Sequence, residues 1–330
     1  MEATVSKFEH YIGLDWAQSN MAAAVLTVGG TKPRILEGRP DIEKLKRFIK
    51  SFEGTKRLVI EETTSTQWLF GALVGSVDEL VVCDPYKNKL MTYGPKTDRI
   101  DSVKLAELAM RQDINIVYHS TSNIMLLRRI ISGYEDVVRS IVRAKNQQSA
   151  IFRGECKRYK SKDKLQWGED VFVSSLKDKE IEFMELQKSE YEKAFRAYAK
   201  KGVVRNLMSI PGIGLICAVK ILGCVVDARR FSSRSKFYGY CGLAKHVMIS
   251  GGKCYGKKKT RYSRVMKCVF KTAAMAAISG ENGLSKYYTT LLSEGYPEHT
   301  ARNVIARRIA VITLGIMKSG VKYQEKQIAA

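Results

Sequence analysis

Three strand-length apolar segments follow one another at the start of this 330-residue chain, and helical and strand-like segments alternate after them. The first three segments form the pattern of an antiparallel meander, with a Gly-Gly turn between the second and the third. They are residues 11–17, 22–28 and 31–38. Helical periods then begin near Asp41, Thr66 and Asp98, and strand-like runs lie at 57–63, 79–85 and 114–118. Asp41 is the expected cap of its helix.

This order predicts a mixed α/β sheet with helices on its faces. Three strands followed by alternating helix and strand match an RNase H-like (RuvC-like) fold, which we assign to residues 1–120. Apolar residues at helical spacing then predict a long helix over 121–155 and another over about 177–201, with a basic linker between them. Paired, these helices would form a stalk over residues 121–201.

Residues 202–330 are expected to form a mainly helical, basic C-terminal domain. Its Pro-Gly-Ile-Gly segment is typical of a helix-hairpin-helix turn. In such a turn Gly212 and Gly214 let backbone N–H groups approach a phosphate. A tight turn between two helices without any ligand explains the same residues.

The formal net charge of +23 lies entirely in the second part of the chain. Residues 1–120 carry 16 basic and 16 acidic residues, whereas residues 121–330 carry 40 basic and 17 acidic residues, a difference of 23. Such asymmetry attracts polyanions, so nucleic acid is the expected partner. A membrane is not expected, because no apolar run is long enough to span a bilayer and no targeting signal is visible.

The cysteines point to a reduced, cytoplasmic setting. There are seven of them, an odd number, and no Cys-x-x-Cys pair occurs. With only four histidines in the chain, this pattern argues against a disulfide framework and against a zinc site.

Carboxylates follow the strand-like segments of the neutral domain. Asp15 comes after one apolar run, and Glu61 and Glu62 end another. With Asp98 and Asp101 they offer oxygen ligands that suit Mg²⁺, and phosphodiester cleavage uses two such ions about 3.5–4 Å apart. Another strand-end acid, Asp84, precedes a proline and fits a simple turn.

Asp98 and Asp101 allow two interpretations. At a helix start they can cap free N–H groups and complement the helix dipole. Three positions apart, they also lie about 5–6 Å from each other on one helix face, where they can share a cation. This segment alone leaves both interpretations open.

These motifs resemble, in the same order over nearly the full length, the DEDD transposases of the insertion-sequence 110 family, which are recombinases guided by a bridge RNA. The resemblance rests on five segments: GLDWA at 13–17, VIEETTS at 59–65, KTDRIDSVKLAEL at 96–108, SIPGIG at 209–214 and GLAKHVMISGG at 242–252. It implies that Asp15, Glu61, Asp98 and Asp101 bind divalent metal together. Glu61 is assigned rather than Glu62 because the family motif has a threonine two positions after its glutamate, and Thr63 lies two positions after Glu61. The glycine that follows in the family motif is replaced by Thr64 in this chain.

The resemblance also implies a nucleophile. The family's serine lies eight residues after the glycine of a Gly-Leu motif, which falls on Ser250, and it forms a covalent phosphoserine link to DNA. The implied site is composite, with the acidic domain supplied by another subunit. From the sequence alone Ser250 is a turn serine without an evident His-Asp pair to activate it. Lys245 replaces the proline that the family usually has after this motif.

Basic residues around this serine are candidate phosphate contacts, although a solvated loop explains them as well. They are Lys253, Lys257, Lys258, Lys259, Arg261 and Arg264. Tyr255 and Tyr262 flank this run and offer rings on which bases can stack.

The sequence therefore favours an insertion-sequence transposase that cuts and exchanges DNA strands with Mg²⁺, guided by a non-coding bridge RNA. The expected working form is a homo-oligomer, a dimer or tetramer, for which the helix at 121–155 offers an apolar stripe. The expected location is the prokaryotic cytoplasm, on the nucleoid. Three alternatives stay open: a DEDD-type site-specific DNA invertase, an architectural nucleic-acid-binding protein, and a Holliday-junction-resolvase-like nuclease without serine chemistry.

Overall fold

The computed structural model describes residues 7–88, 97–111, 114–161, 163–258 and 261–325. The chain divides into two compact units, Met1–Met125 and Leu126–Ala330. The segment expected to be a stalk therefore groups with the C-terminal part of the chain rather than standing as a third unit.

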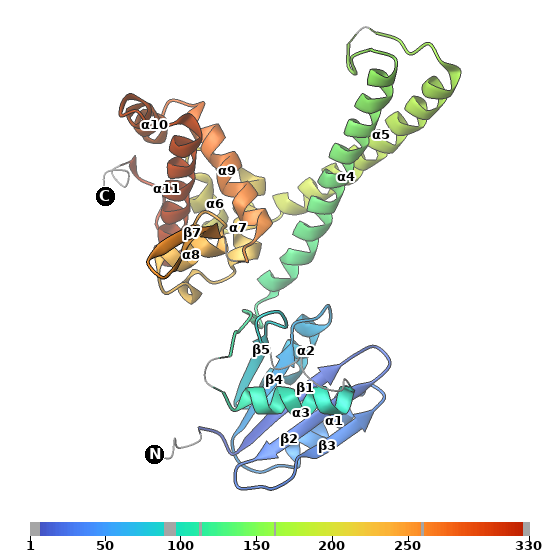
Figure 1. The fold of residues 1–330 in the computed structure, drawn as a ribbon, viewed down its shortest axis with the longest axis vertical. Coiled ribbons are helices and arrows are strands. Elements are labelled where there is room, and N and C mark those ends of the chain that lie inside the picture. Colours follow the sequence, from blue (N-terminus) through green and yellow to red (C-terminus); the bar gives the residue numbers. More distant parts are fainter. Residues whose placement is uncertain (1–6, 89–96, 112–113, 162, 259–260, 326–330) are drawn as a thin grey trace. The chain divides into compact units, whose positions relative to one another are not determined.

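The first unit is built on a five-stranded mixed sheet with the order β3-β2-β1-β4-β5 (Figure 1). Its strands are β1 (His10–Trp16), β2 (Met21–Thr27), β3 (Arg34–Gly38), β4 (Lys56–Glu61) and β5 (Glu79–Cys83). The first three pair antiparallel, β4 lies parallel to β1, and β5 lies parallel to β4. The predicted meander and mixed sheet are confirmed, and this α/β arrangement is compatible with an RNase H-like fold.

Helices cover both faces of the sheet. On one face, α1 (Ile42–Lys50) and α2 (Thr66–Leu73), which continues into η1 (Val74–Ser76), bury a core with Ile12, Leu14 and Ile60. On the other face, α3 (Asp98–Ala109) packs over Val59 and Cys83 (Figure 1). As predicted, Asp41 caps α1, since its Oδ1 accepts a hydrogen bond from the backbone N–H of Lys44.

The prediction of a strand at 114–118 is wrong. Within the described residues this segment forms one isolated antiparallel bridge, between Ile116 and Cys83. Its backbone hydrogen bonds with β5 and the residue after it involve Val82 and Asp84. On Asn115 the side-chain amide of Asn88 adds two more: its Nδ2 donates to the carbonyl oxygen, and its Oδ1 accepts from the N–H. A side chain can satisfy one residue in this way but cannot continue a ladder.

The second unit begins with two long helices that lie side by side, α4 (Leu127–Gly154) and α5 (Gly168–Arg196), after a short turn η3 (Asn123–Leu126) (Figure 1). Helix α5 begins earlier than the sequence suggested. The apolar face of α4 is used within the chain, because Ile141 and Ala144 pack against Ile181 and Met184 of α5. This face of α4 is therefore occupied by a partner helix of the same chain, and the oligomeric state stays a prediction.

The rest of the second unit is mainly helical. Its elements are α6 (Gly202–Met208), α7 (Leu215–Val225), η4 (Ala228–Arg230), α8 (Arg234–Tyr240), the hairpin β6 (His246–Ser250) and β7 (Lys253–Lys258), α9 (Arg264–Ile278), α10 (Gly283–Ser293) and α11 (Glu298–Ser319). None of the helices in the described residues combines the length and the apolarity that a membrane crossing needs.

Candidate active site

The register of the sheet puts Asp15 and Glu61 on the face that α3 covers. Leu14 pairs with Ile60 between β1 and β4, so Asp15 and Glu61 each follow the last paired residue of adjacent parallel strands. Side chains alternate between faces along a strand. Glu61 shares its face with Val59 and lies opposite Cys83, and both of these residues belong to the core under α3.

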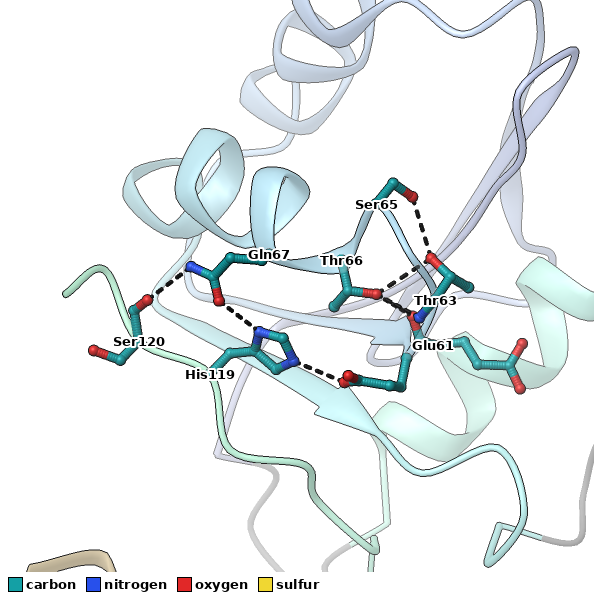
Figure 2. A network of polar contacts seen from close by, with 8 residues as sticks. Glu61, Thr63, Ser65, Thr66, Gln67, His119 and Ser120 are labelled. Carbon is teal, nitrogen blue, oxygen red and sulfur yellow. Dashed lines mark hydrogen bonds and ion pairs between the residues drawn. The ribbon is translucent and has the colours of Figure 1, made fainter. Parts of the chain in front are cut away.

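Glu62 points to the other side and is held in a polar network. Its Oε2 lies 2.7 Å from Nε2 of His119, whose Nδ1 lies 2.9 Å from Oε1 of Gln67. Gln67 in turn donates to the carbonyl oxygen of Ser120. Figure 2 shows the carboxylate of Glu61 directed away from His119. The two adjacent glutamates therefore have different surroundings: Glu61 faces α3, and Glu62 fastens the chain after residue 118 to α2.

Small residues let α3 approach the sheet closely. A Cβ atom on Gly13 would collide with the carbonyl oxygen of Ser102 and the backbone nitrogen of Ala106. Ala24 pairs with Gly13 and Ala22 pairs with Asp15, so two alanines line the same face of β2. The first turn of α3 is thereby held near the end of β1, where Asp15 lies.

Neither aspartate of α3 caps the helix. The cap is Thr97, whose hydroxyl accepts from the N–H of Ile100. Asp98 is the first helical residue and is exposed, and its Oδ2 accepts a hydrogen bond of 2.6 Å from Nδ2 of Asn20 in the β1–β2 turn. The prediction that the side chains of Asp98 and Asp101 cap the helix is therefore wrong. Both acids still complement the helix dipole.

Asp101 is buried, at 4% exposure, and its Oδ1 has no hydrogen-bond partner in the described structure. The nearest cation is the ammonium group of Lys104, 3.8 Å away, one turn along the helix. A buried carboxylate oxygen without a hydrogen bond is costly unless something else compensates it. A bound divalent cation would supply the positive charge that compensates this oxygen.

The donor set fits Mg²⁺ in kind, since Asp15, Glu61, Asp98 and Asp101 all offer oxygen. In the part of the chain that the structure describes, however, no group of three or more His, Cys, Asp and Glu side chains is arranged to hold a metal ion. The acids converge on one end of one sheet face and would have to draw closer to share a cation. Beside Glu61, burial, and then the charge of Glu61, raise the pKa of the Cys83 thiol to about 12.

A pocket of about 320 Å³ opens next to these acids. Trp16, Ala17 and Gln18 line it from the end of β1, and residues 63–65 line it from the loop after β4. The indole of Trp68, which is 52% exposed, lies 5.9 Å from that of Trp16 between ring centroids. Trp16 is half-buried against the core, so the exposed Trp68 indole is the one that suits the stacking of a nucleobase.

Ser250 is exposed at the end of β6, where it pairs with Lys253 across a two-residue turn. Gly251 and Gly252 both have positive φ, 54° and 74°, as a type I′ hairpin turn requires. The glycines are thus explained by the turn itself. The ribbon is exposed on both strands, including apolar side chains such as Ile249 at 67% and Tyr255 at 68%. His246 lies at the far end of β6, opposite Lys258.

The basic residues near Ser250 are exposed wherever the structure describes them. They are Lys253, Lys257, Lys258, Arg261 and Arg264, whereas Lys259 lies outside the described residues. Tyr262 does not offer a free ring, because a Cβ atom on Gly242 would collide with that ring and Lys267 Nζ lies 5.1 Å from its centroid. The stacking role expected of Tyr262 is therefore wrong.

The two glycines of the turn between α6 and α7 differ. Gly212 has a φ of 84°, and a Cβ atom there would collide with the carbonyl oxygen of Ala273, so this glycine allows close packing against α9. This packing explains Gly212 without a ligand, and its phosphate contact stays a prediction. Gly214 is exposed and precedes α7 as its N-terminal flanking residue, with nothing within 4 Å of its added Cβ position. Gly214 stays a candidate for phosphate contact.

Sequence reasoning missed the residues that support the acids. Asn20, Lys104 and His119 contact the acids from distant or helical positions, and no local motif marks them. Thr97 had a readable signal, because a threonine directly before an apolar-periodic helix is a preferred cap. Trp68 also had a readable signal, because it is an aromatic residue near the start of the short helix that follows Glu61 and Glu62.

Two family models match the chain. Residues 12–156 match a model described as a transposase, for the DEDD transposases of IS110 elements, and this segment contains the four candidate acids. Residues 204–289 match a model described as a transposase of the IS116/IS110/IS902 family, and this segment contains Ser250. A protein described as the uncharacterized 43.6 kDa protein of insertion element IS110, from Streptomyces coelicolor, is 25% identical over 124 residues, 37% of this chain. The match spans 31% of that relative, about a third of its length.

Proposed function

The chain belongs to the IS110 family of transposases, and we propose that it cuts and rejoins DNA strands at the ends of an insertion sequence by serine attack on phosphodiesters. The observation that carries this proposal is the common face of Asp15 and Glu61 beneath α3. The first turn of that helix contributes Asp98 and the buried oxygen of Asp101 that accepts no hydrogen bond.

The four acids would hold Mg²⁺. When bound, the cation supplies positive charge that polarises a phosphodiester and favours ionisation of a nearby hydroxyl. Asn20 positions the Asp98 carboxylate through its hydrogen bond, and Lys104 stands near Asp101 as a counter-charge when the cation is absent. The exposed Trp68 indole, next to that of Trp16, offers a stacking surface for a base beside the phosphate.

The Ser250 hydroxyl would attack the phosphorus atom. The bond from Oγ to phosphorus forms as the bond from phosphorus to the departing DNA oxygen breaks, the serine proton is lost, and the departing oxygen takes up a proton. Rejoining reverses these changes with the oxygen of another strand, so no external energy source is needed. The exposed hairpin tip, with its adjacent lysines, is accessible to a DNA backbone. The acids and Ser250 have to act on one phosphate, as a site shared between subunits would allow.

The excess charge of residues 121–330 supports contact with more nucleic acid than the cut strand alone. We propose that a non-coding bridge RNA is bound there and selects the DNA by base pairing. An invertase of the same type, which would read DNA bases directly, is distinguished by tight binding to one duplex sequence in the absence of RNA.

A second candidate is a resolvase-like nuclease that uses water rather than Ser250. It is favoured by the position of His246, which lies four residues from Ser250 at the opposite end of β6 and so cannot activate it locally. The two candidates differ in one product. Serine attack leaves protein joined to DNA, whereas water attack leaves free DNA ends.

The deciding experiment uses the full chain purified from cells that carry its native flanking DNA. Bound RNA is sequenced first, and nicked DNA is then offered with Mg²⁺. We expect to recover one RNA species. We also expect strand cleavage by the wild type and none by Asp98→Ala. Cleavage that Asp98→Ala leaves intact would remove the acids from the mechanism, and purified protein without a specific RNA would favour the invertase.

A further inference from the structure

The strand β6 carries an exposed apolar side chain at every position between His246 and Ser250. Val247 is 50% exposed, Met248 44% and Ile249 67%. Single exposed apolar residues are ordinary on a protein surface. Three in succession, directly before the candidate nucleophile, indicate an interaction surface on the β6–β7 ribbon.

The register of the ribbon separates its two faces. Directly paired residues of antiparallel strands share a face, and successive residues along a strand alternate between faces. Ser250 therefore shares one face with its partner Lys253. Ile249 pairs with Cys254 on the other face, which also carries Val247. Near its turn the ribbon thus offers a hydroxyl and an ammonium group on one side and an aliphatic side chain on the other.

A bulge next to Ile249 adds an exposed aromatic ring. Met248 pairs with Gly256 and Ile249 pairs with Cys254, so Tyr255 is an extra residue between these two pairs. Gly256 has a φ of 134°, a backbone conformation that favours glycine. Bulges increase the local twist and re-aim side chains. The turn end of the ribbon therefore carries one aliphatic and one aromatic side chain, both largely exposed.

The charge around the ribbon indicates what binds to its apolar side chains. Residues 228–280 contain no aspartate or glutamate, and the exposed Lys257 and Lys258 lie on β7 itself. A second copy of the ribbon would bring lysines against lysines, which is repulsive. Duplex DNA instead offers phosphates to the lysines and, between its stacked base pairs, an apolar space for an aliphatic side chain. Duplex DNA is therefore the partner that the ribbon fits.

We propose that Ile249 inserts between two base pairs next to the phosphate that Ser250 attacks, an inference that rests on the proposed function. A ribbon whose serine face lies against one DNA backbone presents its opposite face to the base edges of the groove. Isoleucine inserted there unstacks the base step and bends the duplex. Tyr255 would stack on a base displaced at that step. The unstacked step would let the cut strand leave its duplex, which rejoining with another strand requires.

The fluorescence of 2-aminopurine, which rises when this base analogue is unstacked, tests the insertion without cleavage. Full-length Ser250→Ala protein with its co-purified RNA is mixed with duplexes of the native element end, each carrying the analogue at one position. At one base step the rise should depend on the inserted side chain. Adding Ile249→Ala should abolish the rise at that step, and adding Ile249→Leu should keep it. The matched control is Val247→Ala, on the same face of the ribbon, which should also keep it.

Cleavage by otherwise wild-type protein tests what the insertion does. Ile249→Ala should cut the intact duplex about tenfold more slowly, because the apolar burial that offsets unstacking is lost. A mismatched base pair at the same step should restore its rate, because that step is already partly unstacked. Since these side chains are exposed, thermal unfolding of each variant should match that of wild type.

Three results would overturn the proposal. They are a fluorescence rise that Ile249→Ala leaves unchanged at every position, an equal loss with Val247→Ala, and a mismatch that fails to restore the rate of Ile249→Ala. Equal loss with Val247→Ala would mean that the whole apolar face docks without insertion. The fluorescence needs no cleavage, so it stays readable if the serine chemistry fails. Conversely, Ser250 can still become joined to DNA if Ile249 inserts nowhere.

Discussion

Asn20 in the β1–β2 turn donates a hydrogen bond of 2.6 Å from its Nδ2 to Oδ2 of Asp98, the first residue of α3. The turn follows directly on β1, which carries Asp15. One amide therefore links the two elements that hold three of the four candidate metal ligands. If these acids act together, this contact positions them.

Asn20→Ala should accordingly lower Mg²⁺-dependent DNA cleavage about tenfold, mainly through weaker apparent Mg²⁺ affinity, while thermal stability changes little. The physical reason is that the Asp98 carboxylate loses the donor that fixes its orientation. Cleavage measured over a Mg²⁺ titration checks this, with the exposed neighbour Ser19→Ala as control. Restoration of full rate at high Mg²⁺ is expected; a Mg²⁺ dependence identical to wild type would show that Asn20 positions nothing.

Asp101→Asn should separate metal binding from folding. The substitution removes a buried charge that accepts no hydrogen bond but also takes away the partner of Lys104, 3.8 Å from it, so the metal-free protein should be about as stable as wild type. Wild type should gain stability with Mg²⁺ according to RT ln(1 + [Mg²⁺]/Kd), and the variant should lose most of that gain. Thermal unfolding with and without Mg²⁺ checks both statements, with Glu107→Gln on the exposed side of α3 as control. Equal Mg²⁺ stabilisation of wild type and Asp101→Asn would argue against this ligand.

Glu61→Gln and Glu62→Gln should have opposite effects. Glu61→Gln should abolish cleavage with little effect on unfolding. Glu62→Gln should keep cleavage but lower the free energy of unfolding by about 1–2 kcal/mol, because it weakens the contact with the buried His119 side chain. Urea unfolding and cleavage assays on the same preparations check this pair. Loss of activity at Glu62 together with normal activity at Glu61 would exchange their roles.

Trp68→Ala should weaken binding of single-stranded DNA by about 1–3 kcal/mol, the contribution of one stacked base. Trp167→Phe removes the third tryptophan, so that the remaining fluorescence reports on Trp16 and Trp68 alone. In that background a thymidine octamer should quench the emission, and an abasic octamer of equal length should not. Equal quenching by both oligonucleotides would mean that only the backbone is bound.

Much of the first unit was predictable because its elements are local. Continuous apolar runs define β1 and β2, and the Asp41 cap is visible next to its helix. The segment at 114–118 was misassigned because its composition suits a strand, while its pairing with β5 is limited to one bridge and the other side of Asn115 is bound by the side chain of Asn88, which is distant in sequence.

The candidate site was predictable in its acids and not in its supports. Local spacing and the family motif mark Asp98 and Asp101, but the choice of Glu61 over Glu62 on physical grounds needs the register of β4 against β1 and β5.

The most direct test of the central claim is the identity of the residue that becomes joined to DNA. Full-length protein with its RNA is trapped on a nicked substrate in Mg²⁺, digested with protease and nuclease, and sequenced by mass spectrometry. The account predicts one modified peptide, carrying a nucleotide phosphate on Ser250, and no adduct and no cleavage from Ser250→Ala, whose DNA and RNA binding stay normal. An adduct on another residue such as Tyr255, or strand cleavage that persists in Ser250→Ala, would contradict it.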